Sequence, residues 1–278
     1  MNKRLLVFSA ILLAMLVLAL VASVPVVSDD RPGDRHPGAR HHDDDDDDGD
    51  GGQEIPFDEA SIFLELNHTD SDLGIHAFVD GDAWTQIEIE SPDEREKLRV
   101  VTRGSFGRHG LTELFFESDE PRFPDEISLE RFFARFPAGE WEISGVTIEG
   151  DELESEVELS HVLAAPPDHV MVNDQEAAEN CDAATLPSVS EPVTISWDMV
   201  TQSHPTVGDT DTIDVVKYQV VVEREDPELV FSVDLPPNVT SFELPEDLTA
   251  LADAFKFEII VRTDTGNQTA LESCFEIE

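Results

Sequence analysis

The sequence predicts an all-β protein with two β-sandwich-like domains in tandem, which follow a signal segment and a disordered acidic spacer. Two observations support this fold class. After residue 55, most segments alternate apolar and polar residues with a period of two, as half-buried strands do. Turn residues separate these segments, and only one stretch has the spacing of an amphipathic helix.

The N-terminal 23 residues are predicted to be a signal peptide. Lys3 and Arg4 precede an apolar run that extends from residue 5 to residue 27, the order of charged and apolar regions in a secretory signal. The small residues before Val24 favour cleavage at that point. The alternative is an uncleaved anchor, because a run of about 20 apolar residues also spans a bilayer. Membrane contact is expected only through such an uncleaved segment.

Residues 24–54 are predicted to form a disordered spacer. After Val27 the segment is rich in Asp, Gly and His and includes six consecutive aspartates, Asp43 to Asp48. Such a segment cannot bury enough apolar surface to offset its ordering entropy. Chelation of divalent ions by His36, His41 and His42 is the alternative, but a specific metal site needs fixed geometry. A solvated tether with incidental ion affinity is the interpretation we favour.

The charge of the chain excludes one class of partner. Its formal net charge is −45, with 62 acidic residues against 17 Lys and Arg. Nucleic acid is excluded, because binding it requires clustered cations that neutralise phosphates. Anionic membrane surfaces are disfavoured for the same reason. The spread of acids over the whole chain indicates adaptation to salt, which screens the repulsion within such a surface.

Residues 55–165 are predicted to form the first sandwich-like domain. A two-residue hairpin turn is expected at Asp80-Gly81, and the alternating glutamates between residues 152 and 158 are expected on a solvated sheet face. One helix is expected from Leu129 to Phe136, with Ser128 as its N-cap. The predicted strands of this domain include residues 61–67, 74–84, 85–90, 97–104, 111–117, 141–147 and 151–162.

The loop after the first of these strands contains a candidate calcium site. Asn67, Asp70 and Asp72 offer the oxygen ligands that calcium prefers. The spacing does not match an EF-hand, since glycine stands at position 74. The alternative is a turn built on Asx side chains.

Residues 166–190 are predicted to be a linker between the domains, and Cys181 at its centre is one of two cysteines. Cys181 and Cys274 form an even pair in a chain that carries an export signal, which predicts a disulfide. The alternatives are a buried free pair and a metal site, but neither cysteine has nearby ligands at the usual spacing.

Residues 191–278 are predicted to form the second domain, whose landmarks resemble the fibronectin type III family. Trp197 and Tyr218 stand where that family keeps a second-strand tryptophan and a third-strand tyrosine, and LPEDLTAL precedes FKFEIIVRTDTGN as a conserved leucine precedes its sixth strand. The departure is Phe255 or Phe257 in place of the family's tyrosine, whose hydroxyl makes a corner hydrogen bond. The resemblance places Cys181 just before the first strand and Cys274 in the last.

The resemblance also implies that two acidic loops emerge at one end of this sandwich. Asp209, Asp211 and Asp214 lie in one loop, and Asp264 and Asn267 lie in the other. Convergence of these residues on calcium is one hypothesis, and an acidic loop tip is the alternative.

The function predicted from the sequence is that of an exported, non-enzymatic protein of the cell envelope or extracellular space. Modules of the resembled family serve as spacers or as binding and adhesion surfaces, so the expected partner is a protein or polysaccharide at the cell surface. The chain has no Gly-x-Ser-x-Gly, His-Glu-x-x-His or phosphate-binding loop. The alternative is a secreted hydrolase or a polysaccharide-binding accessory with its site in the first domain. Exposed Trp84 and Trp141 would favour sugar binding, whereas buried they are core.

Overall fold

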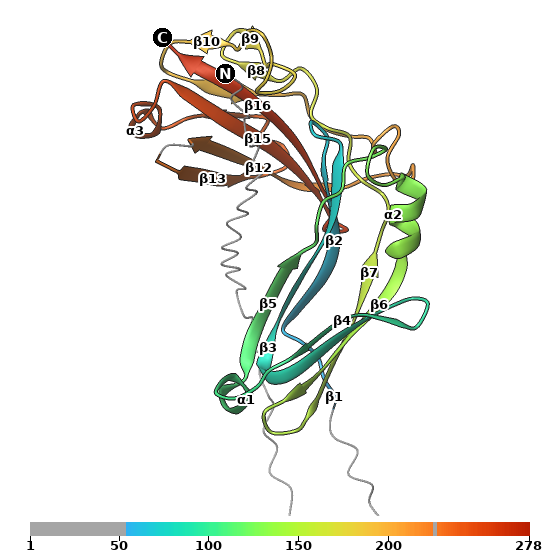
Figure 1. Cartoon of the computed structure of the whole chain (residues 1–278). Helices are drawn as coiled ribbons and strands as arrows, with labels where there is room; N and C mark the ends of the chain where they lie inside the picture. Colours follow the sequence, from blue (N-terminus) through green and yellow to red (C-terminus); the bar gives the residue numbers. More distant parts are fainter. Residues whose placement is uncertain (1–53, 225–226) are drawn as a thin grey trace, which may run out of the picture. The chain divides into compact units, whose positions relative to one another are not determined.

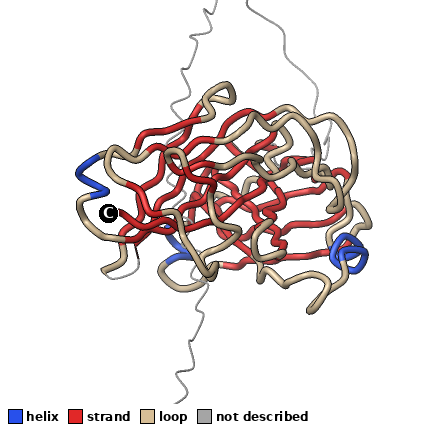
Figure 2. The backbone as a smooth tube through the Cα atoms, turned by 90° about the horizontal axis from the view of Figure 1, so that it is seen from above, coloured by secondary structure: helices blue, strands red, loops and turns tan. Residues whose placement is uncertain are grey.

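The computed structural model describes residues 54–224 and 227–278 (Figure 1). The predicted signal peptide and the spacer up to residue 53 lie outside these residues. Strands dominate the described chain (Figure 2), which confirms the all-β prediction. The described helices are α1 Phe106–His109, α2 Leu129–Arg135 and α3 Glu246–Thr249.

None of the helices within residues 54–224 and 227–278 is long and apolar enough to cross a membrane.

The first sandwich consists of two groups of strands that share one long strand, β3. One group pairs β2 and β5 with the first part of β3. The other has the order β1-β7-β6-β3, and β4 pairs with the opposite edge of β3. The strands are β1 Glu54–Ile55, β2 Glu59–Asn67, β3 Asp72–Ser91, β4 Arg95–Val101, β5 Leu111–Glu117, β6 Gly139–Thr147 and β7 Glu152–Leu159.

The predicted hairpin at Asp80-Gly81 is wrong, because β3 continues through these residues. Its residues up to Asp80 pair with β2, and its residues from Trp84 onward pair with β6. The pairing with β5 shifts register between Asp80 and Trp84, so the strand bends here as it changes partners. A Cβ atom on Gly81 would lie 3.0 Å from the ring of Phe57. The glycine therefore serves close packing in a bent strand instead of a turn.

The core of the first sandwich forms from the alternating apolar residues of these strands and from α2. Trp84 and Trp141 are 0% and 1% exposed, so both are core residues. The predicted helix is confirmed: the Ser128 side chain accepts a hydrogen bond from the Arg131 amide, and Phe132 is buried. The glutamates of β7 between residues 152 and 158 are exposed, as expected for a solvated face.

The second sandwich consists of two sheets that face each other across a separate apolar cluster. One has the order β14-β11-β8-β9, and the other has the order β16-β15-β12-β13 with β10 paired to β16. Strands β14, β11 and β8 thus face β16, β15, β12 and β13, a two-sheet arrangement that fits the resemblance to fibronectin type III. The strands are β8 Met171–Val172, β9 Gln175–Glu176, β10 Ser188–Val189, β11 Thr194–Ser196, β12 Val215–Arg224, β13 Leu229–Leu235, β14 Ser241–Glu243, β15 Ala254–Thr263 and β16 Gln268–Ile277.

Aromatic residues that carried the resemblance pack together in this second core. Trp197 and Tyr218 are buried with their ring centroids 5.3 Å apart in an edge-to-face arrangement. The Tyr218 hydroxyl accepts a hydrogen bond from the Val200 amide at 2.8 Å. Phe255 and Phe257 are both buried. A tyrosine hydroxyl thus satisfies a buried backbone amide, but it comes from β12 instead of β15.

The segment between the predicted domains contributes to the second sandwich. Residues 166–190 contain β8, β9 and β10, and β8 and β10 pair with β11 and β16. The predicted disulfide is confirmed: Cys181 and Cys274 are bonded, with their Cα atoms 4.9 Å apart. The bond ties this segment to β16. The domain boundaries 55–165 and 191–278 stay predictions.

Hydrogen bonds join the two sandwiches directly. Residues Gln268–Ala270 of β16 pair in parallel with Glu65–Asn67 of β2 (Figure 1). The side chain of Asn267, which is 1% exposed, accepts a hydrogen bond from the Leu64 amide at 2.8 Å. Its amide nitrogen donates to the carbonyls of Ser160 and Val162 at 2.8 and 2.9 Å. We call this β2–β16 pairing, together with the Asn267 side chain, the junction.

Replacing Asn267 by alanine should weaken the coupling between the sandwiches. The change leaves one buried amide and two carbonyls without their partner, at a cost of roughly 3 kcal/mol or more in the free energy of unfolding. Differential scanning calorimetry should show one cooperative transition in the wild type and a broadened or divided transition in N267A.

Asn173→Ala is the matched control. Asn173 also bridges two backbone groups, the Thr194 amide and the Ser190 carbonyl, but both lie within the second sandwich. N173A should lower the midpoint and preserve a single transition. Equal changes in transition shape for the two variants would contradict the coupling role of Asn267.

Candidate functional site

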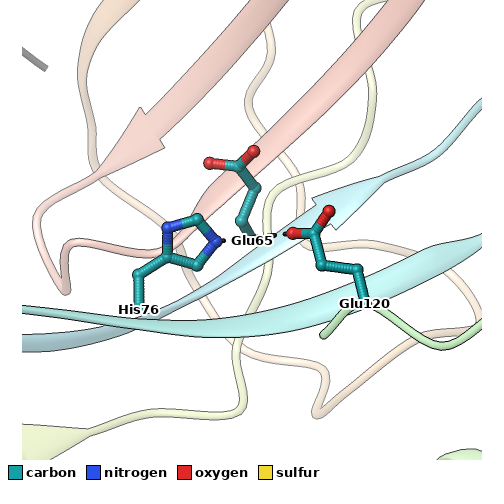
Figure 3. A group of neighbouring side chains, drawn as sticks. All are labelled: Glu65, His76 and Glu120. Carbon is teal, nitrogen blue, oxygen red and sulfur yellow. Dashed lines mark hydrogen bonds and ion pairs between the residues drawn. The ribbon is translucent and has the colours of Figure 1, made fainter. Parts of the chain in front are cut away.

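A buried cluster of one histidine and two glutamates lies on the first sandwich beside the junction. Glu65 comes from β2, His76 from β3 and Glu120 from the segment after β5 (Figure 3). One ligand atom from each side chain lies within 4.8 Å of the others. His76 Nε2 and Glu120 Oε1 are 3.4 Å apart. We call these three residues the Glu-His-Glu cluster.

Strand register explains why these side chains meet. Glu65 is opposite Gly74, and Phe63 is opposite His76 in the β2–β3 ladder. Since side chains alternate along a strand, Glu65 and His76 share the face that points away from the apolar core. The Phe63 ring stacks on the His76 ring with their centroids 5.2 Å apart, which fixes the imidazole.

Gly74 provides the space that Glu120 occupies. A Cβ atom at position 74 would lie 2.6 Å from Glu120 Oε1 and 2.8 Å from Glu120 Cγ. Such contacts are too close for any side chain, so only glycine lets Glu120 cross this part of β3 toward His76. The approach of Glu120 to His76 therefore depends on the absence of a side chain at position 74.

Burial and like charge shift the acids here toward their neutral forms. Burial raises the pKa of Glu65 to about 7, and the charges of Glu120, Glu258 and Glu117 add to the rise while His76 opposes it. The pKa of Asp72 also rises to about 7, through burial and the charges of Glu120 and Asp70.

The histidine of the cluster shifts toward its charged form. Burial lowers the pKa of His76, but the hydrogen bond to Glu120 and the charges of the nearby glutamates outweigh it, so the net pKa is raised. The surrounding carboxylates therefore favour a cation at this position.

Several polar atoms in and beside the cluster lack a hydrogen-bond partner among the described residues. They include Glu65 Oε2, His76 Nδ1 and Asp72 Oδ1. An unpaired polar atom that is removed from water costs free energy. The cluster therefore offers one imidazole and two carboxylates, with unused acceptor capacity on Glu65.

In the first predicted calcium loop, Asn67 and Asp70 already interact with other groups of the protein. Asn67 Oδ1 accepts hydrogen bonds from the amides of Thr69 and Asp70, which forms an Asx turn. Asp70 forms an ion pair with Arg122 at 3.6 Å. Asp72 is buried on the same face of β3 as His76. Calcium binding by this loop stays a prediction.

The second predicted calcium site lies on two loops that meet through their backbones. The Asp264 amide donates to the Asp214 carbonyl at 2.9 Å. Asp209, Asp211, Asp214 and Asp264 are all exposed, and Asp211 accepts a hydrogen bond from the Thr212 amide. Within residues 54–224 and 227–278, the Glu-His-Glu cluster is the only group of three His, Cys, Asp or Glu with converging ligand atoms. Calcium binding here also stays a prediction.

A histidine pair links the same end of the second sandwich to the first. His68 Nδ1 and His204 Nε2 are 3.1 Å apart. The other ring nitrogen of His204, Nδ1, accepts from the amides of Thr206 and Val207, so the proton of the neutral ring lies on Nε2 and is donated to His68. Burial and the charge of His68 lower the pKa of His204 to about 4.

Sequence reasoning missed the Glu-His-Glu cluster. Glu65 and His76 stand at polar positions of alternating strands, a pattern that is typical of a solvated face. Their burial comes from tertiary packing, and Glu120 lies in a segment with no recognisable motif. Gly74 was the available signal, since a glycine within a strand often marks the close approach of another group.

Comparison with known proteins gives structural similarity only. No family model matches the sequence, and no curated protein matches it. A segment of two fibronectin type III domains from chicken tenascin is 12% identical, and the match covers 78% of this chain and 99% of that chain with a TM-score of 0.29. A structure described for host-cell-surface retention of a 1.5-MDa bacterial ice-binding adhesin is 9% identical, and the match covers 81% and 66% of the two chains with a TM-score of 0.22. The fold assignment therefore rests on the strand order described above.

Gly74→Ala should lower the pKa of His76. The added methyl group displaces Glu120, and the histidine then loses the hydrogen bond that raises its pKa. Because Glu120 can swing toward solvent, the cost in stability should be only about 1 kcal/mol. NMR titration of the His76 ring in metal-free protein measures the shift.

Gly107→Ala is the control for this titration. A Cβ atom at Gly107 would make only ordinary contacts, 3.5 Å or more from Thr102, so the pKa of His76 should not change. An unchanged pKa in G74A would show that Glu120 does not act on His76 as described.

His204→Asn should make the junction less sensitive to acid. Since His204 has a lowered pKa, the unfolded state binds more protons than the folded state between about pH 6.5 and pH 4, and the stability contributed by the neutral ring is lost as pH falls through this window. The loss is at most about 3 kcal/mol. An Asn side chain keeps an acceptor for the two amides but does not titrate.

The measurement is urea unfolding of wild type and H204N between pH 7 and pH 4. As pH falls, the free energy of unfolding should decrease more in the wild type than in H204N. Parallel pH profiles would exclude His204 as an acid-sensitive group.

Proposed function

We propose that this chain is an exported, non-enzymatic binding or structural spacer protein of the cell envelope or extracellular space. In this proposal, the two sandwiches act as one rigid body that the acidic spacer holds away from the cell. The observation that carries it is the junction, where β16 extends the sheet of β2 and Asn267 bonds to three backbone groups of the first sandwich.

The junction supports a mechanical role because it leaves little freedom for the sandwiches to move independently. Domains that are joined by a flexible linker move relative to one another by default. Here a parallel strand pairing, buried amide hydrogen bonds and the His68–His204 pair all oppose such motion. A rigid extension suits a protein that presents a surface at a distance.

The disulfide supports export. Cys181 and Cys274 are bonded, and disulfides persist in oxidising compartments outside the cytosol. The predicted signal segment, residues 1–23, is consistent with such a location. A surface rich in acidic residues suits a saline exterior, where salt screens their repulsion.

The proposal of a non-enzymatic role rests on the sequence, which contains none of the nucleophile, metalloprotease or phosphate-loop motifs. The alternative, a polysaccharide-binding accessory or hydrolase, has less support because Trp84 and Trp141 are buried. Neither ring is available to stack on a sugar. The partner we propose is a protein or polysaccharide at the cell surface.

Expression of the full chain in a secreting host tests the export on which this function depends. We expect the protein outside the cytoplasm, with Val24 at its N-terminus by mass spectrometry and with both cysteines resistant to alkylation until reduction. The physical reason is that disulfides form and persist in oxidising compartments, whereas the cytosol generally keeps thiols reduced.

The fate of residues 1–23 separates the two forms of the proposal. A chain that keeps these residues and stays in the membrane fraction with an intact disulfide is the anchored form. Retention in the cytoplasm with both thiols free would contradict export and with it the proposed function.

A further inference from the structure

We propose that the Glu-His-Glu cluster binds a divalent transition-metal cation, with Zn²⁺ as the best match to its ligands. Glu65, His76 and Glu120 supply two carboxylate oxygens and one imidazole nitrogen, and water completes the coordination. None of its three ligands belongs to the acidic loops that the sequence suggested for calcium, and Asp72 of the first loop lies beside it, on the same face of β3 as His76. It does not depend on what the protein binds at the cell surface.

The ligand geometry favours a small cation. In a tetrahedral zinc site with bonds of about 2.0–2.2 Å, two ligand atoms lie roughly 3.4 Å apart. His76 Nε2 and Glu120 Oε1 are 3.4 Å apart, which is long for a charge-assisted hydrogen bond. The third ligand atom lies within 4.8 Å of both, so a small side-chain rotation of Glu65 completes the set.

Glu65 provides the second, independent observation. Its side chain is on the face shared with His76, the residue is 5% exposed, and its Oε2 atom has no hydrogen-bond partner among the described residues. A buried carboxylate that lacks a partner is costly unless it is neutralised or coordinates an ion. Figure 3 shows this carboxylate beside the His76–Glu120 pair.

The identity of the ligands determines the class of cation. Calcium takes six to eight oxygen ligands and has little affinity for imidazole. Zinc and neighbouring transition metals accept imidazole together with carboxylates. The Glu120 side chain is 10% exposed, whereas that of His76 is fully buried, so an ion can enter from the side of Glu120.

A bound ion would connect three parts of the first sandwich at the edge of the junction. Its ligands come from β2, from β3 and from the segment after β5. Glu65 is paired with Gln268 of β16 in the β2–β16 ladder. Coordination would therefore fix the strand to which the second sandwich is attached.

Calorimetric titration of the full, metal-free chain with ZnCl₂ in high sodium chloride tests the proposal. The wild type should bind one Zn²⁺ at this site. The isosteric changes Glu65→Gln and Glu120→Gln should each weaken that binding at least tenfold, because each removes a ligand. Co²⁺ should give the absorption of a low-coordinate site in the wild type and lose it in both variants.

Two matched controls separate this site from general electrostatics. Glu117→Gln removes a carboxylate whose charge also acts on His76 but which is not a ligand, and it should change affinity less than threefold. Replacing His36, His41 and His42 of the spacer by alanine should leave the site intact. Circular dichroism checks that each variant is folded. If E65Q does not fold, the result for E120Q, whose side chain is partly exposed in the wild type, decides the test.

Three results would overturn the proposal. The first is zinc binding that is lost in the spacer variant and kept in E65Q and E120Q, which places the ion on the spacer alone. The second is calcium that competes with zinc at equal concentration. The third is the absence of saturable zinc binding in the wild type.

Discussion

The structure depends on one constraint, that the buried backbone where the two sandwiches meet must find hydrogen-bond partners. Asn267 meets much of this requirement, since its side chain bonds one amide of β2 and two carbonyls of the segment that leaves the first sandwich. Thr269 adds a bond to the Ala164 carbonyl. Because these groups are buried, water cannot replace the side chains, and the two sandwiches hold each other in place.

This constraint also limits which parts of the acidic loops are open to a ligand. In a free-standing sandwich of this topology, the loop before β12 and the loop before β16 would be available to a ligand. Here Val207 of the first loop packs in the core of the first sandwich, and Asn267 of the second is buried at the junction. The aspartates remain exposed on the parts of the loops that the junction does not use. The junction therefore leaves only the aspartate-bearing parts of the two loops open to solvent.

The sequence predicts most of the fold because the fold follows from local patterns. Alternation identified the strands, Ser128 and the phenylalanine spacing identified α2, and the cysteine pair identified the disulfide. Asp80-Gly81 misled because the same residues suit a turn and a bent strand, and only the partners of β3 decide between them. The Glu-His-Glu cluster was missed because Gly74 signals only that some group approaches β3 closely, and tertiary packing alone brings Glu120 there.

The disulfide also sets how far the chain can be extended. Cys181 and Cys274 enclose a loop of 93 positions, and a covalent bond shortens the path between them to a few ångströms. If a pulling force unfolds the second sandwich, the residues between the two cysteines cannot extend along the direction of the force. The unravelled chain is then shorter by roughly 300 Å than an uncrosslinked one, at about 3.3–3.6 Å per extended residue. The cross-link therefore limits how far the protein can lengthen under load.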